Sequence, residues 1–208
     1  MDFIPYILTA VIAYLLGSIP SGYLAAKAKG IDIRTVGSGN IGATNAFRVL
    51  GKPIGSLVLF TDALKGYASA AFLPFLIMKI FPAMTAHHDA LSIIGGAGAI
   101  LGHNYTCWLK FKGGKGVATT GGVVLAWAPL AVLVTFIVWV IVVKITRYVS
   151  AGSITAAIVL PIAVYFSGRS SAMIIVLSIL CALAIYKHKS NIQRLMNGTE
   201  NKVGAKKT

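Results

Sequence analysis

The sequence predicts an all-α membrane protein with seven transmembrane helices. Of its 208 residues, 57% are hydrophobic and only 12% are charged, and the mean hydropathy is +0.81. A soluble domain of this size usually carries about 25% charged residues. The apolar residues gather in runs, and a membrane-spanning helix needs roughly 20 of them in a row. The chain therefore has more apolar surface than a soluble core can bury, and lipid is expected to cover much of it.

Five apolar runs are long enough, or nearly long enough, to span a bilayer. They cover about 3–25, 53–80, 90–108, 151–167 and 171–186. No basic segment precedes the first run and no small-residue cleavage site stands out, so it is predicted to be a retained helix. A sixth run, about 117–146, is longer and contains Pro129, which cannot donate a backbone hydrogen bond and tends to break a helix.

The positions of Lys and Arg decide whether this sixth run is one helix or two, because positive residues mark the cytoplasmic side. They cluster in 25–52, in 109–116 and in the tail from 187. With six helices the tail would lie opposite the other two clusters. With a split at Pro129 all three share one side with Lys144 and Arg147, and only Lys79, Arg169 and the intrahelical Lys65 fall elsewhere. We therefore expect seven helices, with the N-terminus outside and the C-terminus in the cytoplasm.

The net charge of +14 limits the possible partners. The positive residues lie between apolar runs, so anionic lipid or an anionic substrate is favoured over nucleic acid. Cys107 and Cys181 lie in different settings without a CxxC motif, so no disulfide and no metal site are expected. No metal-binding cluster is visible elsewhere in the sequence, and no cofactor is predicted. The domain prediction is a single membrane domain over 1–198, followed by a polar, lysine-rich disordered tail over 199–208.

Glycines and polar residues concentrate in loops on the expected cytoplasmic face, which predicts an active site built from loops. The first such loop reads VGSGNIGATN over 36–45 and is followed by Arg48. Glycines let a backbone approach a ligand and cradle an anion with its amides, and an arginine can hold phosphate through two parallel bonds. A polar loop with turn glycines is the alternative. The candidate substrate contacts here are Gly37, Ser38, Gly39, Asn40, Thr44 and Asn45, with Arg48.

The second loop contains GHNYT over 102–106 and FKGGKGVATT over 111–120. Lys115 lies between glycines just before a predicted helix, whose N-terminus attracts anions. This is not a nucleotide P-loop, because Leu109 and Gly116 replace residues that the P-loop motif requires. A basic loop obeying the charge rule would explain Lys110 and Lys112 but not the glycines. The further candidates are His103, Asn104, Gly113, Gly114, Gly116 and Thr119.

Two later segments add polar candidates. Ser150 and Ser153 lie in YVSAGS over 148–153, where they could instead cap the next helix. In KHKSNIQRL over 187–195, followed by Gly198 and Glu200, a helix would place His188 and Asn191 on one face.

Two features of the helices themselves have a structural interpretation. Asp62 and Lys65 lie inside the second apolar run at a spacing of three, where they can neutralise each other. We favour a structural pairing over a direct catalytic role. The spacing Gly98-xxx-Gly102, preceded by Gly95 and Gly96, predicts close helix packing.

Taken together, these motifs resemble the bacterial acyl-phosphate:glycerol-3-phosphate acyltransferase family over nearly the whole chain. The resemblance is carried by GSGNIGATN with Arg48, DALKG at 62–66, GHNY with FKGGKGVAT, YVSAGS, and KHKSNIQRL with Gly198 and Glu200. It implies a seven-helix enzyme of the bacterial cytoplasmic membrane that moves a fatty acyl group from acyl phosphate to the 1-hydroxyl of glycerol 3-phosphate. The products would be lysophosphatidic acid and inorganic phosphate. The site residues that it implies are Ser38, Arg48, Lys115, Ser153 (or Ser150), His188 and Asn191.

The chain has no HxxxxD motif, and acyl phosphate already carries a good leaving group. We therefore expect substrate-assisted catalysis, in which a phosphate oxygen with a second pKa of about 6 takes the hydroxyl proton. The alternatives are an acyltransferase that uses acyl-CoA or acyl carrier protein, a transporter of organic phosphate, and a lipid-binding membrane anchor. A chain with seven helices of its own is expected to work as a monomer, while chain-length preference and substrate order stay open.

Overall fold

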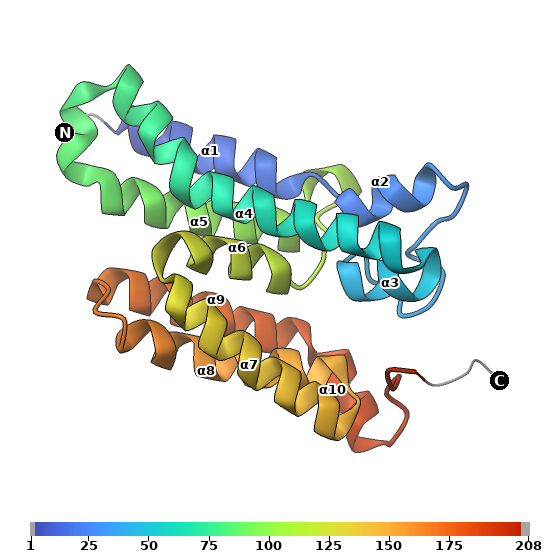
Figure 1. Cartoon of the computed structure of the whole chain (residues 1–208). Coiled ribbons are helices and arrows are strands. Elements are labelled where there is room, and N and C mark those ends of the chain that lie inside the picture. The colour runs from blue at the N-terminus through green and yellow to red at the C-terminus, as the bar shows by residue number, and fades with distance from the viewer. Residues whose placement is uncertain (1–2, 205–208) are drawn as a thin grey trace. The chain divides into compact units, whose positions relative to one another are not determined.

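The computed structural model describes residues 3–204, which form ten α-helices and two short 3₁₀ helices. The chain divides into two compact units, Met1–Trp127 and Ala128–Thr208 (Figure 1). Each unit is a helical bundle of its own and is described separately.

The first unit packs its long helices around α5. Its helices are α1 (Ile4–Ser18), α2 (Ser21–Lys27), α3 (Ala43–Leu50), α4 (Lys52–Ile80), α5 (His88–Asn104) and α6 (Val117–Trp127). The 3₁₀ helix η1 (Pro82–His87) joins α4 to α5, and η2 (Cys107–Leu109) follows α5. Helix α5 packs against α1 and α4, and α6 packs mainly against α4 (Figure 1).

The first apolar run is not one continuous helix. Helix α1 ends at Ser18 and α2 begins at Ser21, with Ile19 in an extended conformation (φ −57°, ψ 112°) between them. Pro20 causes this break, because proline lacks the backbone N–H and disfavours helical geometry in the residue before it. The prediction of a single helix over 3–25 is therefore wrong in this detail, although Ile4–Lys27 is still long and apolar enough to cross a membrane.

Glycines on α5 bring three neighbouring helices into close contact with it. A methyl group at Gly95 would overlap the Ser69 carbonyl of α4, and one at Gly102 would overlap the Tyr14 carbonyl of α1. A methyl group at Gly96 would lie 2.6 Å from Val123 of α6. The predicted close packing at these glycines is confirmed, since each faces a backbone or side chain that leaves no room for a Cβ atom.

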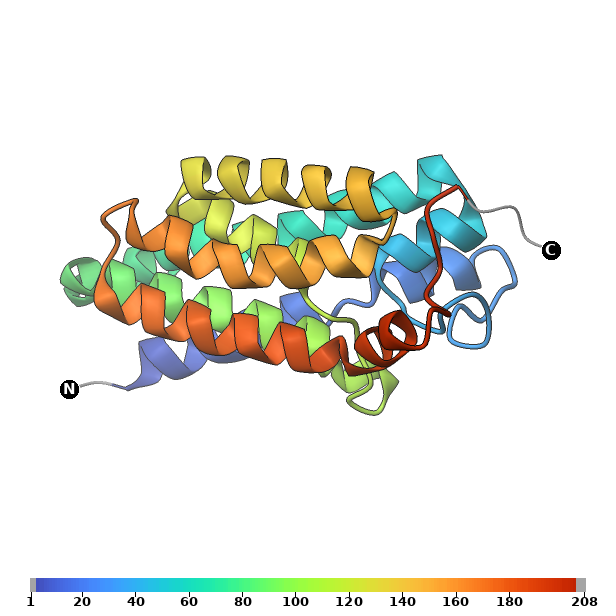
Figure 2. The same cartoon turned by 90° about the horizontal axis from the view of Figure 1, so that it is seen from below.

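The second unit contains α7 (Pro129–Thr146), α8 (Val149–Tyr165), α9 (Ser171–Lys187) and α10 (Lys189–Met196). The predicted break in the run 117–146 is confirmed, because Pro129 is the first residue of α7, where its missing N–H costs nothing. Helix α8 packs against both α7 and α9 and lies between them (Figure 2). Helices α9 and α10 meet at an angle of 51°.

Large apolar side chains cover the outside of these helices. Phe60, Phe72 and Phe75 of α4 are each about 60% exposed, and only Ala131 and Thr135 of α7 are buried. Within residues 3–204, Ile4–Lys27, Lys52–Ile80 and Pro129–Thr146 are long and apolar enough to cross a membrane, and the bent pair α9–α10 gives a fourth span if counted as one. Apolar surface of this extent is typical of a protein surrounded by lipid.

The first residues of the predicted tail over 199–208 have hydrogen-bond partners in the second unit. The N–H of Thr199 donates to the Arg194 carbonyl, and the N–H of Val203 donates to the Arg147 carbonyl at 2.8 Å. The Arg147 guanidinium returns a bond to the Val203 carbonyl at 2.9 Å. Residues 199–204 are therefore tied to α7 and α10, while 205–208 lie outside the described residues.

The α5 packing makes a stability prediction. Gly95→Ala should lower the apparent thermal unfolding midpoint of the purified protein in detergent, at a cost of about 1–3 kcal/mol, because α4 cannot move away without losing its other contacts. Gly121→Ala is the matched control, since a methyl group on this helical glycine meets no atom within 4 Å. That control should leave the midpoint unchanged or slightly raised. Equal midpoints for the two variants would contradict the packing role of Gly95.

Candidate functional site

Both glycine-rich segments of the first unit are anchored on one apolar core. Ile33 and Ile41 of the α2–α3 loop are buried beside Leu109 of η2. Ala26, Ala46 and Val58 complete this cluster. The two loops therefore lie at the same end of the first unit, as Figure 1 shows. The charge distribution predicted that the two loops lie on one side of the membrane.

The Asn45 side chain organises the first loop. Its Oδ1 accepts a hydrogen bond from the Ser38 N–H at 2.9 Å. Its Nδ2 donates to the backbone carbonyls of Ile33, Val36 and Asn40 at 2.9–3.2 Å. Gly37 lies so close that a Cβ atom would overlap the Asn45 amide. The amide that we expected to contact substrate is thus already engaged, and it holds the loop in shape.

Other polar residues of this loop are open to solvent or only partly covered. Ser38 and Thr44 are exposed, and Asn40 accepts a hydrogen bond from the Gly42 N–H at 2.8 Å. Gly37 and Gly39 have φ values of 63° and 68°, which glycine adopts without strain.

Two arginines near this loop differ in their partners. Arg34 forms an ion pair with Asp32 at 2.7 Å, and its hydrogen bonds to the Asp32 carboxylate lower the pKa of that group to about 2. Arg48, half-buried in the last turn of α3, makes no side-chain hydrogen bond or ion pair to the other described residues. Its guanidinium is therefore available to an anion.

The second loop folds back on the end of α5. The Gly114 N–H donates to the His103 carbonyl at 3.0 Å, and the Gly113 N–H donates to the Asn104 carbonyl at 3.2 Å. A Cβ atom at Gly114 would overlap the His103 ring, and one at Gly116, where φ is 80°, would lie 2.7 Å from Asn104 Oδ1. These contacts explain the glycines on either side of Lys115.

Helix α6 begins directly after this loop. Lys115 is half-buried two residues before the first residue of α6, Val117. An anion bound at the loop would meet both the ammonium group and the positive end of the helix. Thr119, in the first turn of α6, is fully buried, and its hydroxyl has no hydrogen-bond partner among residues 3–204.

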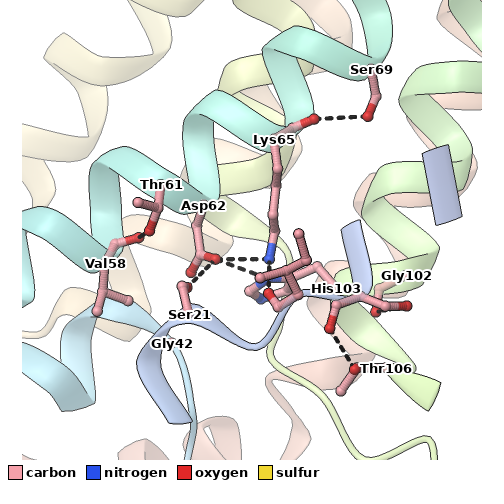
Figure 3. Close-up of polar contacts among 12 residues, drawn as sticks. Ser21, Gly42, Val58, Thr61, Asp62, Lys65, Ser69, Gly102, His103 and Thr106 are labelled. Atoms are coloured by element: carbon pink, nitrogen blue, oxygen red, sulfur yellow. Dashed lines mark hydrogen bonds and ion pairs between the residues drawn. The ribbon is translucent and has the colours of Figure 1, made fainter. Parts of the chain in front are cut away.

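A buried ionic cluster adjoins the second loop through His103. We define the Asp62 cluster as Ser21, Asp62, Lys65 and His103 (Figure 3). The Lys65 ammonium lies 2.8 Å from Asp62 Oδ1, which confirms the predicted pairing. Ser21 Oγ donates to the same oxygen at 2.7 Å, and His103 Nδ1 lies 3.6 Å from it. A small pocket adjoins the cluster, lined also by Gly17, Ser18, Ile19, Pro20, Ile41 and Thr106. The sequence prediction missed Ser21, for which Pro20 was the only local signal.

In the second unit, Glu200 draws three polar side chains together. Its Oε1 accepts from Ser150 Oγ at 3.0 Å and from Asn191 Nδ2 at 2.7 Å. Its Oε2 accepts from Arg194 Nε at 2.7 Å. Burial raises the pKa of the Glu200 carboxyl, but the hydrogen bonds from Asn191, Arg194 and Ser150 outweigh it, and the pKa falls below its usual value. The sequence motif included Glu200, but only the fold shows that it joins Ser150 to Asn191.

The remaining two candidates of this unit have backbone partners. His188 is buried with Nδ1 2.7 Å from the Ala184 carbonyl, so Nδ1 must donate and a neutral ring carries its lone pair on Nε2. Ser153 Oγ donates to the Val149 carbonyl at 3.0 Å and accepts from the Trp139 indole at 3.4 Å. The two candidate serines thus differ, since Ser150 contacts Glu200 and Ser153 faces α7.

Comparison with known proteins agrees with this set of motifs. Residues 7–198 match the family described as "Glycerol-3-phosphate acyltransferase". The chain belongs to this family. The resemblance predicted from the motifs is therefore confirmed.

Curated relatives cover nearly the whole chain. The glycerol-3-phosphate acyltransferase of Trichlorobacter lovleyi is 47% identical over 193 residues, which is 93% of this chain and 95% of that protein. The enzyme of Bacillus subtilis is 45% identical over 197 residues, which is 94% and 96% of the two chains.

Two crystal structures of PlsY (YgiH), described as an integral membrane glycerol 3-phosphate acyltransferase, have the same fold. The glycerol 3-phosphate form has a TM-score of 0.85 at 42% identity, covering 96% of each chain. The lysophosphatidic acid form has a TM-score of 0.83 at 41% identity, covering 96% of this chain and 95% of that one. The present chain is thus an acyltransferase of glycerol 3-phosphate with an all-helical integral membrane fold like that of PlsY.

The Glu200 network makes a pH prediction. The folded-state pKa of Glu200 lies below the usual 4.5, so the carboxylate stabilises the fold above that pH and this contribution is lost as the pH falls through the folded-state pKa. The thermal midpoint of the native protein should exceed that of Glu200→Gln by a constant amount above about pH 5.5. The difference should shrink below pH 4.5. A difference that does not change between pH 7 and pH 4 would contradict the network.

Proposed function

We propose that this enzyme takes its acyl group from a fatty acyl phosphate and releases lysophosphatidic acid and inorganic phosphate. The observation that carries the proposal is the pair of glycine-rich loops on one apolar core of the first unit. One is followed by Arg48, whose guanidinium has no partner among the described residues, and the other holds Lys115. Two phosphate-bearing substrates call for more than one cationic, amide-rich loop.

The reaction needs little from the protein besides binding and charge stabilisation. The 1-hydroxyl oxygen of glycerol 3-phosphate forms a bond to the acyl carbon, and the bond from that carbon to the phosphate oxygen breaks. The hydroxyl proton passes to a phosphate oxygen, whose second pKa of about 6 suits this task. No covalent enzyme intermediate is required, because phosphate is a good leaving group. Arg48 and Lys115 offset the charge that develops on the phosphate and the oxyanion.

The other site residues contribute hydrogen bonds. We assign substrate contacts in the first unit to Ser38 and to the amides of the glycine-rich loops. In the second unit we assign them to His188, Asn191 and one of the serines Ser150 and Ser153. The Nδ1 bond of His188 to the helix backbone supports this role, since it orients the ring and sets Nε2 as the acceptor of a neutral imidazole.

The proposed setting is the bacterial cytoplasmic membrane, with seven spans, the N-terminus outside and the active site facing the cytoplasm. The distribution of Lys and Arg supports this orientation. We further propose that residues 1–198 act as one functional domain and that the enzyme works as a monomer.

Phosphate release tests the donor. Purified protein in lipid is given palmitoyl phosphate with and without glycerol 3-phosphate, and palmitoyl-CoA and palmitoyl-acyl carrier protein in parallel. We expect release only with palmitoyl phosphate and glycerol 3-phosphate together, with an equal amount of lysophosphatidic acid formed. Turnover with palmitoyl-CoA or the acyl carrier protein alone would contradict the proposed donor while leaving the acyl acceptor unchanged.

Arg48→Lys tests phosphate recognition by the first loop. Lysine keeps the charge but cannot form two parallel bonds, so kcat/KM for glycerol 3-phosphate should fall by about 10- to 100-fold. Arg34→Lys is the control, because this arginine lies on the same loop in an exposed ion pair with Asp32. That control should change kcat/KM less than about twofold. Near-normal turnover of Arg48→Lys would remove Arg48 from the site.

A further inference from the structure

The Asp62 cluster is built from charged groups to which the proposed function assigns no task. The side chains of Asp62 and Lys65 are 2% and 8% exposed, and that of His103 is 6% exposed. Ionisable side chains buried in a membrane protein are costly and usually have a partner and a role. The pairing of Asp62 with Lys65 satisfies the charges but does not explain why α1, α2 and α5 also contribute contacts.

One set of contacts closes the break between α1 and α2. The Lys65 ammonium donates to the carbonyl of Ile19, the residue after α1, at 3.0 Å, and the Ser21 N–H donates to the same oxygen at 3.1 Å. Ser21, the first residue of α2, donates to Asp62 (Figure 3). A cation suits the C-terminal end of a helix. Helix α4 thus holds both ends of the break through two side chains one turn apart, and α2 leads from there into the first loop.

The second set of contacts runs from Asp62 to the loop of Lys115. The His103 ring lies between them, with Nδ1 3.6 Å from Asp62 Oδ1. The backbone carbonyl of His103 accepts the Gly114 N–H at 3.0 Å, and Gly114 lies against the ring too closely to carry a Cβ atom. Gly114 directly precedes Lys115. A movement of the His103 ring would therefore displace the backbone that presents the Lys115 ammonium.

We infer that Asp62 is a positioning residue for acyl transfer, which holds His103 under Gly114 and so sets the place of the Lys115 loop. His103 then acts through the loop and not by touching substrate, which revises our sequence-based expectation for this residue. The inference rests on the role of Lys115 in the proposed function. It also gives Ser21 a part, because Ser21 fixes the same carboxylate oxygen that faces His103.

A double-mutant cycle tests the inference. Asp62→Asn keeps the shape of the side chain and removes its charge, and a displacement on the order of 1 Å at a positioned group can cost about 100-fold in rate. We expect kcat/KM for glycerol 3-phosphate to fall by about 10- to 100-fold in the native background. In a Lys115→Ala background the same change should cost less than about threefold, because the loop no longer presents the ammonium.

Matched variants separate positioning from loss of folded protein. Ser21→Ala removes one hydrogen bond to Asp62 and should lower kcat/KM by about two- to tenfold in the native background only. Asp89→Asn, an exposed acid at the start of α5, should change nothing. Apparent thermal midpoints of all variants are measured, and rates are referred to folded protein. If Lys115→Ala has no measurable turnover, Lys115→Gln serves as the second background, since it also lacks the positive charge.

The outcomes for the two proposals differ. Native turnover of Lys115→Ala would overturn the role of Lys115 in the proposed function, whatever Asp62→Asn does. The positioning inference alone would be overturned if Asp62→Asn lowered kcat/KM by the same factor in the native and the Lys115→Ala backgrounds, and Ser21→Ala likewise. An effect that does not depend on Lys115 is what a general loss of stability would give. Unchanged kinetics of Asp62→Asn would also overturn it.

Discussion

Close backbone contact around α5 is the constraint on which the first unit depends. In lipid there is no hydrophobic gain from bringing two apolar helices together, so association relies on van der Waals contact and hydrogen bonds. Glycines on three sides of α5 allow this contact with α1, α4 and α6 at once. Because the Lys115 loop folds back on the last turn of α5, the same packing also decides where the loop lies.

The charged side chains fall into two groups: those paired with an opposite charge, which maintain the fold, and those without such a partner, which are available to a ligand. Asp62 with Lys65, Asp32 with Arg34, and Glu200 with Arg194 are all paired within their own units. The chain has only five acidic residues against 19 Lys and Arg, so most positive charges have no acidic partner to meet. Arg48 is one of these, and its place after a glycine-rich loop makes that excess of charge useful for binding phosphate.

The features that could be predicted from sequence were those with a strong local cause. Runs of apolar residues identified the helices, Pro129 identified a break, and the glycine spacing on α5 identified close packing. Pro20 was overlooked because its apolar run continues on both sides, although its chemistry is the same as that of Pro129. The seven-span count and the orientation rest on charge distribution and stay predictions.

The site was harder to predict than the fold, because a side-chain amide or hydroxyl does not reveal its partner. Asn45 looks like a ligand-binding residue in the sequence, yet its amide is engaged by the backbone of Ile33, Val36 and Asn40. Glu200 joins Ser150 to Asn191 across 50 residues of sequence, and such non-local contacts leave no periodic pattern. Residues that hold a loop in shape and residues that contact a substrate are therefore of the same types, and only the fold distinguishes the two groups.

The Asp62–Lys65 pair also bears on how the chain enters the bilayer. A nascent helix that carries two opposite charges one turn apart can neutralise them before any other helix is present, which reduces the cost of leaving the translocation channel for lipid. The remaining partners, Ser21 and the Ile19 carbonyl, come from a segment synthesised earlier. Only His103 is made later, and it completes the cluster when α5 is inserted. The buried charges thus acquire their partners in the order in which the chain is synthesised.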